Sequence, residues 1–188
     1  MSKPSLIIIN GLPGTGKTTL GKKIADEFHL PFLSKDDIKE LLFETLGYSD
    51  REWSKKIGAS SFALLYQTVG SILKANKSLI VETYFTPKFD EKKFLDLKNK
   101  YSFIPFQIVC RCKGEILFDR FKARALSDVR HPGHNDDNHL DEWREKLLSE
   151  EMEALKIGGE VFDLDTSDYD SIDYEKLFNA LKSTTNNT

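Results

Sequence analysis

The chain has 188 residues, 39% of them hydrophobic and 30% charged, which is the composition of one globular domain able to bury a core. Its 27 basic residues stand against 30 acidic ones, so no overall basic field draws it to long nucleic acids or anionic lipid. The N-terminal apolar run covers only residues 6–9, too short for a signal peptide or a membrane span, so we expect a cytoplasmic protein.

The predicted elements alternate between strands and helices. Apolar runs predict strands at 6–10, 31–34, 78–83, 103–110 and 160–164. Apolar residues at helical spacing predict helices at about 17–28, 35–46, 51–75, 90–100, 115–126, 140–156 and 174–181. This alternation is typical of an α/β fold with three layers, in which helices cover both faces of a five-stranded parallel sheet.

Two segments lack any periodic pattern. Residues 127–138 are rich in Asp, His and Asn, which predicts a solvated loop within a lid segment at about 120–139. Residues 183–188 are polar, and we expect a disordered tail there. The whole chain, 1–188, is expected to form a single domain that includes the lid and the tail.

Residues 11–18, Gly-Leu-Pro-Gly-Thr-Gly-Lys-Thr, match the phosphate-binding pattern G-x-x-x-x-G-K-[ST] between a predicted strand and a predicted helix. Glycines let backbone N–H groups approach phosphates, and the helix N-terminus adds partial positive charge. Lys17 would reach the β- and γ-phosphates, and the Thr18 hydroxyl would ligate Mg²⁺. The predicted nucleotide site comprises Gly11, Pro13, Gly14, Thr15, Gly16, Lys17, Thr18 and Thr19. The alternative is a glycine turn with no ligand.

Other parts of the sequence favour ATP as the nucleotide. A mechanical ATPase needs an acidic pair at the end of its Walker B strand and a helical lid domain, but this short chain offers only Glu82, after residues 79–81. A GTPase would normally carry Asn-Lys-x-Asp, and the segments 76–79 and 99–102 both lack its Asp.

Carboxylates follow two predicted strands, where open α/β sheets bind their ligands. Asp36 and Asp37 come after the second strand, and a carboxylate in this position can accept the proton of an acceptor hydroxyl. Their alternative reading is a helix cap with a first-turn acid. Glu82 and Thr83 end the third strand, expected beside the first, and would hold a Mg²⁺-bound water or the acceptor. The alternative for Glu82 is a solvated strand end.

The phosphate-binding loop followed by Lys35-Asp36-Asp37-Ile38-Lys39 resembles the small P-loop kinases that include polynucleotide 5′-kinase, chloramphenicol phosphotransferase and the zeta toxins. The resemblance implies a P-loop NTPase fold with Asp36 as general base. It places Lys39 where polynucleotide kinase has the acceptor-binding arginine of its Arg-Asp-Asp-Tyr-Arg pattern. Lys39 departs from that pattern, because lysine lacks the planar fork that grips a phosphate bidentately.

Arg120 and Arg124 lie four residues apart on a predicted helix before the irregular loop, as the lid arginines do in the resembling kinases. With Lys17 and Asp36 they form the predicted catalytic set, because lid arginines stabilise the charge of phosphoryl transfer. The alternative is a salt-bridged helix face.

Three further predictions concern the end of the lid and the fifth strand. Arg130 and His131 extend the basic cluster and are predicted to contact acceptor or phosphate, although the nearby histidines also admit a metal site. Asp165 and Thr166 resemble the Asp-Thr-Ser segment that many small kinases place near adenine. Their alternative is a helix-capping turn.

Together these features predict an ATP- and Mg²⁺-dependent phosphotransferase that moves the γ-phosphate to a hydroxyl of a small molecule or nucleotide. The alternatives are an NTP-dependent switch without an acceptor and a nucleic acid 5′-end kinase. The sequence specifies neither the acceptor nor the oligomeric state.

Overall fold

The computed structural model contains a β-sheet, and the carboxyl ends of its strands form the edge where open α/β sheets bind their ligands. The structure describes residues 3–149 and 152–185. Within them, five strands lie in the order β2, β3, β1, β4, β5, and every neighbouring pair is parallel. The strands are β1 (Ser5–Gly11), β2 (Phe32–Ser34), β3 (Leu79–Thr83), β4 (Ile104–Arg111) and β5 (Glu160–Asp165). The prediction of a five-stranded parallel sheet is confirmed, and the loops after its strands meet at one edge.

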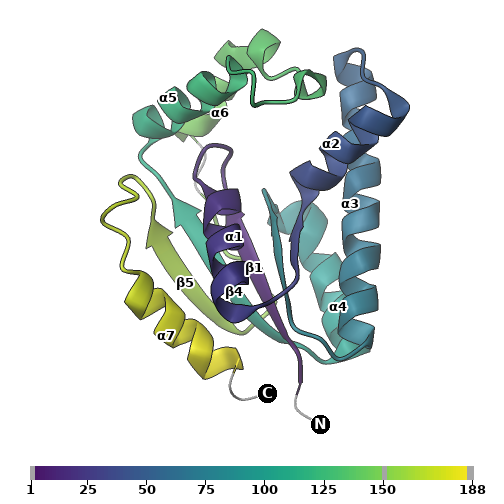
Figure 1. Cartoon of the computed structure of the whole chain (residues 1–188), viewed down its shortest axis with the longest axis vertical. Coiled ribbons are helices and arrows are strands. Elements are labelled where there is room, and N and C mark those ends of the chain that lie inside the picture. The colour runs from purple at the N-terminus through teal and green to yellow at the C-terminus, as the bar shows by residue number, and fades with distance from the viewer. Residues whose placement is uncertain (1–2, 150–151, 186–188) are drawn as a thin grey trace.

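The helices complete a three-layer fold (Figure 1). They are α1 (Lys17–Phe28), α2 (Lys35–Leu46), α3 (Arg51–Lys74), α4 (Lys92–Tyr101), α5 (Gly114–Ala125), α6 (Leu140–Ser149) and α7 (Tyr174–Thr185). Helices α1 and α7 cover one face of the sheet, and α3 and α4 cover the other. Figure 1 shows α5 and α6 near the end of the sheet where the phosphate-binding loop lies, with the segment between them reaching toward α2.

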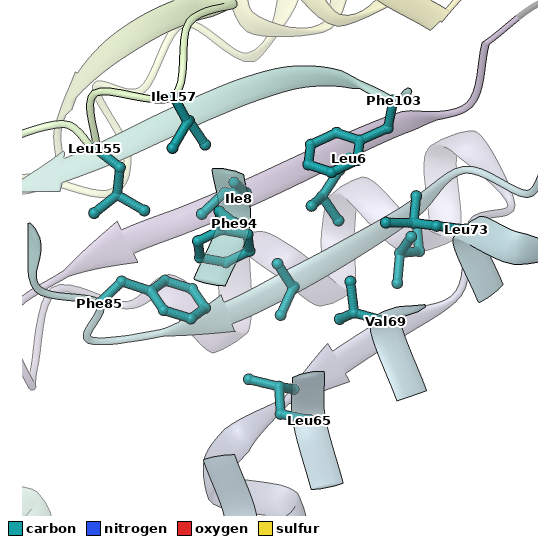
Figure 2. Close-up of a cluster of buried hydrophobic side chains, with 12 residues drawn as sticks. Leu6, Ile8, Leu65, Val69, Leu73, Phe85, Phe94, Phe103, Leu155 and Ile157 are labelled. Atoms are coloured by element: carbon teal, nitrogen blue, oxygen red, sulfur yellow. The ribbon is translucent and has the colours of Figure 1, made fainter. Parts of the chain in front are cut away.

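The core lies on both faces of β1, whose residues are all buried. Leu6 and Ile8 face α3 and α4, whereas Ile7 and Ile9 face α1 and α7, as expected from the two-residue period of a strand. On the α3 side, Leu65, Val69 and Leu73 recur every four residues and gather beside β1 with other buried side chains (Figure 2). Fully burying such a side chain contributes about 1.5–3 kcal/mol, so this core holds the ligand-binding edge rigidly.

The helix predicted at 140–156 ends earlier. Helix α6 is described as far as Ser149, residues 150–151 lie outside the described residues, and residues 152–159 are not helical. The Gln107 side chain donates to the Leu155 carbonyl at 2.9 Å and accepts from the Leu155 amide at 2.8 Å. Leu155 and Ile157 then enter the core cluster of α3. The prediction is therefore wrong at 152–156, because a segment without regular structure brings Leu155 and Ile157 into the core.

Smaller differences occur at two other element ends. The helix predicted from residue 90 begins at Lys92, after a π-helical turn at Pro87–Glu91. At the other end of the chain, α7 continues to Thr185, and Ser183 donates its hydroxyl to the Ala180 carbonyl at 2.7 Å. Residues 183–185 thus extend the last helix, whereas the rest of the predicted tail, 186–188, lies outside the described residues.

Candidate active site

The phosphate-binding loop joins β1 to α1 through backbone that glycine adopts easily. Gly14 has φ of +92° and Gly16 has φ of +79°, in the left-handed region where other residues are strained. A Cβ at Gly16 would also overlap the Tyr169 hydroxyl. Position 16 therefore requires glycine for two reasons: its positive φ and the close approach of the Tyr169 side chain. The predicted residues from Gly11 to Thr19 lie at the end of β1, in this loop or in the first turn of α1.

Lys17 and Thr18 both reach toward Glu82 at the end of β3. The Lys17 ammonium is buried, donates to the Leu12 carbonyl at 3.0 Å and lies 3.8 Å from a Glu82 oxygen. The other Glu82 oxygen accepts from the hydroxyls of Thr18 at 3.1 Å and Ser34 at 3.0 Å. Burial raises the pKa of Glu82, and the Lys17 ammonium opposes this rise. Thr83, the next residue of β3, is also buried.

The Thr18 hydroxyl and the Glu82 carboxylate fit the donor set of Mg²⁺. This ion binds oxygen ligands, keeps several waters and usually takes one or two carboxylates together with the substrate phosphates. Both side chains lie at the phosphate-binding loop, and the carboxylate is held in place by two hydroxyl donors. Residues at the predicted metal position therefore match the chemistry of the ion.

Asp36 lies in the first turn of α2 between two cations. Its carboxylate accepts from Lys35 Nζ at 3.1 Å and from Arg130 Nη1 at 2.9 Å, and Arg130 also binds Asp136 at 2.9 Å. Burial alone raises the pKa of Asp36, but Lys35 and Arg130 outweigh it and hold that pKa well below its usual range. Asp36 is thus ionised at neutral pH and can orient a hydroxyl group. Asp37 is exposed.

The segment 130–139 packs onto α2 instead of forming the predicted solvated loop. The His131 ring stacks on Phe43 with centroids 5.1 Å apart, and the His134 ring meets Phe43 edge-on at 5.6 Å. His131 also contacts Glu44 at 3.1 Å, and His134 contacts Glu40 at 2.9 Å. His134 and Asp136 are buried. The segment forms no strand or α-helix, as predicted, but it is partly buried instead of solvated, because its rings and charges pack against α2.

The structure reveals no metal cluster in this histidine-rich segment. Among residues 3–149 and 152–185, no three His, Cys, Asp or Glu side chains are grouped so that they could hold a metal ion. His131 instead accepts a hydrogen bond from the Gly133 amide through Nδ1 at 3.0 Å.

The two lid arginines on α5 contact different parts of the site. Arg120 donates to the Thr166 and Ser167 carbonyls at 2.6 and 2.8 Å, and its guanidinium lies 4.5 Å from the Tyr169 ring centre. Arg124 has a buried Nε atom with no hydrogen-bond partner in the described structure. Burial lowers the pKa of Arg124, and Asp36 and Glu82 are among the charges that act on it. Arg124 therefore faces the phosphate side and Arg120 the loop after β5.

Asp165 and Thr166 stabilise that loop through local hydrogen bonds. Asp165 accepts from the Ser167 amide at 2.8 Å, and the fully buried Thr166 donates its hydroxyl to the Arg111 carbonyl at 2.9 Å. The hydrogen bond at the start of α7 comes from a different residue: the Asp173 carboxylate accepts from the Lys176 amide at 2.9 Å. The Thr166 side chain thus shapes the loop, and its backbone carbonyl reaches Arg120.

Sequence reasoning missed several residues that complete the site. Ser34 pairs with Glu82 across β2 and β3, so strand register would have found it. By contrast, no local pattern marks Glu40, His134, Asp136 or Tyr169, which meet their partners only through packing. The predicted residue Lys39 is buried and donates to the Ser54 hydroxyl at 2.9 Å.

Comparison with known proteins agrees with this geometry. A protein of Chloroflexus aurantiacus J-10-fl, described as a "putative kinase", is 38% identical, with a TM-score of 0.91 over 97% of this chain and 98% of the other. A shikimate kinase of Bacteroides fragilis is 27% identical over 140 residues, 72% of each chain. A gluconokinase of Sinorhizobium meliloti 1021, 14% identical with a TM-score of 0.53 over 99% of this chain and 97% of the other, shows the fold alone.

The sheet order, the phosphate-binding loop and these likenesses define a P-loop kinase. More particularly, the chain belongs to the protein family described as an AAA domain, which matches residues 6–149. That match covers both the phosphate-binding loop and the segment that docks on α2. The described residues include no helix long and apolar enough to cross a membrane.

Proposed function

We propose that the protein transfers the γ-phosphate of ATP to a hydroxyl group of a small molecule, with Mg²⁺, in the cytoplasm. The observation that supports this most directly is the position of Asp36. It lies two residues after Ser34, whose hydroxyl donates to the same Glu82 oxygen as the hydroxyl of Thr18 in the phosphate-binding loop. An ionised carboxylate beside a phosphate-binding loop is the arrangement that an acceptor hydroxyl needs.

Each charged residue has a separate task in this proposal. Lys17 binds the β- and γ-phosphates, and Asp36 orients the acceptor hydroxyl and accepts its proton. The acceptor oxygen then bonds to the γ-phosphorus while the bond from that phosphorus to the β–γ bridging oxygen breaks, and ADP leaves. Arg124 stabilises the charge on the transferring group, for which its unpartnered buried Nε is available. Bound Mg²⁺ supplies charge neutralisation on the phosphate oxygens, held by Thr18 and Glu82.

Comparison with relatives supports a small acceptor. The Bacteroides fragilis relative is a shikimate kinase, which indicates a hydroxyl compound of similar size for this chain. The net charge of -3 gives no general attraction to long nucleic acids. A nucleic acid 5′-end kinase is therefore the less favoured alternative, and so is a switch that hydrolyses ATP without an acceptor.

The proposal is tested by phosphate transfer from labelled ATP to a panel of sugars, sugar acids, nucleosides, antibiotics and oligonucleotides. One small acceptor should raise ATP turnover many-fold. In the Asp36→Asn variant, transfer should fall by about 10²-fold or more, while ATP binding by calorimetry stays within a few-fold. Slow ATP hydrolysis that no compound stimulates would favour the switch. Near-normal transfer by Asp36→Asn would move the role of base to Asp37 or Glu82.

A further inference from the structure

A groove of about 720 Å³ lies between α3 and α4 on the outer side of this helical layer. Much of its lining is apolar or aromatic and includes Phe62, Ala63, Tyr66, Leu97 and Tyr101. A second hollow of about 470 Å³ shares Lys74, Lys100 and Tyr101 with it, so the two form one long depression, which we call the α3–α4 groove. The described lining contains none of the residues that we assign to phosphate transfer.

The α3–α4 groove carries unbalanced positive charge. Lys74, Lys93 and Lys100 line it, and all three are exposed. Asp96, the acidic residue of the lining, pairs with Lys92 at 2.8 Å, whereas none of the three lysines forms an ion pair with another described residue. The groove therefore presents positive charge that no carboxylate among residues 3–149 and 152–185 neutralises.

Two of these lysines lie over aromatic rings of the groove. The Lys93 ammonium is 4.8 Å from the Tyr66 ring centre, and the Lys100 ammonium is 5.3 Å from the Tyr101 ring centre. Such contacts attract an ammonium to a ring face, but the ring carries no net charge that could neutralise it. The groove thus combines apolar surface with cations that can still bind a carboxylate.

Negative charge gathers in the segment 160–175, which comprises β5, the following loop and the start of α7. Every charged residue in it is acidic and exposed: Glu160, Asp163, Asp165, Asp168, Asp170, Asp173 and Glu175. Asp163 pairs with Arg111 at 2.6 Å, and none of the other acids forms an ion pair within the described part of the chain. Because the whole chain has a net charge of -3, the chain outside this segment is net positive.

The two oppositely charged surfaces cannot meet within one molecule. Strand β5 is at the edge of the sheet, and Figure 1 shows β5 and α7 on the opposite side of the molecule from α3 and α4. The acidic segment can therefore reach an α3–α4 groove only on another molecule. Such a contact joins two different surfaces, which makes it heterologous, or head-to-tail.

We propose that the α3–α4 groove binds the segment 160–175 of a second copy of this chain. The opposite charges attract and orient the two molecules, and the exposed Val161 of the segment adds apolar contact with the groove. Each pair of molecules leaves one groove and one acidic segment unused, so further copies add to it unless the geometry closes a ring. This inference does not depend on the proposed phosphotransferase activity.

The first test measures self-association of the full chain by sedimentation velocity. The average mass should rise with protein concentration at low salt. Raising NaCl from about 0.05 M to about 0.5 M should weaken the association by about tenfold or more, because salt screens exposed charges. A chain that stays monomeric at low salt up to its solubility limit would overturn the inference.

The second test uses two charge-reversal variants. The groove variant carries Lys93→Glu and Lys100→Glu, and the acidic-segment variant carries Asp170→Lys and Glu175→Lys. Each variant alone should stay monomeric, because it lacks one of the two complementary surfaces. An equimolar mixture should form a dimer as tight as the wild-type contact and no larger species, since each partner keeps one intact surface. A mixture that stays monomeric, or a single variant that associates like the wild type, would overturn the inference.

A control variant separates the groove from net charge. Lys3 and Lys122 are exposed and lie outside both surfaces, so the double change Lys3→Glu and Lys122→Glu matches the groove variant in net charge. It should associate like the wild type, and thermal unfolding should show that every variant folds. Equal loss of association in this control would contradict the groove. A monomeric chain that binds polyglutamate through Lys93 and Lys100 would assign the groove to a different acidic partner and overturn the role of a second copy.

Discussion

The Thr18 hydroxyl donates a 3.1 Å hydrogen bond to the Glu82 carboxylate and so joins the first turn of α1 to the end of β3. The same carboxylate lies 3.8 Å from the Lys17 ammonium. Two residues of the phosphate-binding loop therefore depend on one acid from a different strand. Loss of that acid should affect metal use more than the fold of the loop, which rests on its glycines.

Glu82→Gln should weaken the response to Mg²⁺. The amide keeps the size of the side chain but loses the negative charge that attracts the ion. We expect a loss of about 10–100-fold in metal affinity or activity, the range typical when a group that supports a metal site is changed. Turnover measured against Mg²⁺ concentration checks this, with thermal unfolding as the control for folding. An unaltered Mg²⁺ dependence would remove Glu82 from the metal site.

The two lid arginines should differ in their kinetic effects. Arg124→Met should lower kcat by about 10²-fold or more, as for other lost donors to a transition state, with ATP affinity nearly unchanged. Arg120→Met removes two hydrogen bonds to the loop after β5, so it should raise the KM for ATP more than it lowers kcat. Steady-state kinetics and ATP titration of both variants separate the cases. Equal losses of kcat would show that both arginines act in the transition state, as the sequence predicted.

Gly133→Ala should loosen the segment that docks on α2. A Cβ at Gly133 would lie 2.7 Å from Phe43 Cδ2, and such overpacking costs about 1–3 kcal/mol. Hydrogen exchange should then increase across 130–139, and transfer to the acceptor should fall while ATP still binds. Val129→Ala is the control, since Val129 is 90% exposed. Unchanged exchange in Gly133→Ala would mean that Phe43 does not anchor the segment.

Asp36 should contribute to the stability of the protein in acid. Its pKa in the fold is well below the ordinary value of 3.8, because Lys35 and Arg130 outweigh burial. The carboxylate therefore stabilises the fold above pH 3.8, and this contribution is lost as the pH falls from there through the lower, folded pKa. Urea unfolding across this range should show a steeper loss in the wild type than in Asp36→Asn. Parallel curves would contradict the ion pairs of Asp36.

The strands and the phosphate-binding loop could be predicted because their signals are local. Residues 6–9 form an apolar run between polar neighbours, and 11–18 carry a pattern whose glycines have a conformational purpose. The parallel arrangement followed from the alternation of strands and helices. Helix ends were less predictable, as the segment after Ser149 shows, because Leu155 and Ile157 suit both a helix and an extended core segment.

By itself, the sequence determined the class of fold, the nucleotide loop and the candidate charged residues of the site, since each depends on residues close together in the chain. Only the tertiary structure decided which of those charged side chains contact one another. Arg130 meets Asp36 across 94 residues, Arg120 and Arg124 contact different parts of the site from one helix, and Lys39 donates to the Ser54 hydroxyl of α3. The physical reason is that an ion pair depends on distances of a few ångströms and on burial, which arise only when α2, α5 and the segment 130–139 pack together.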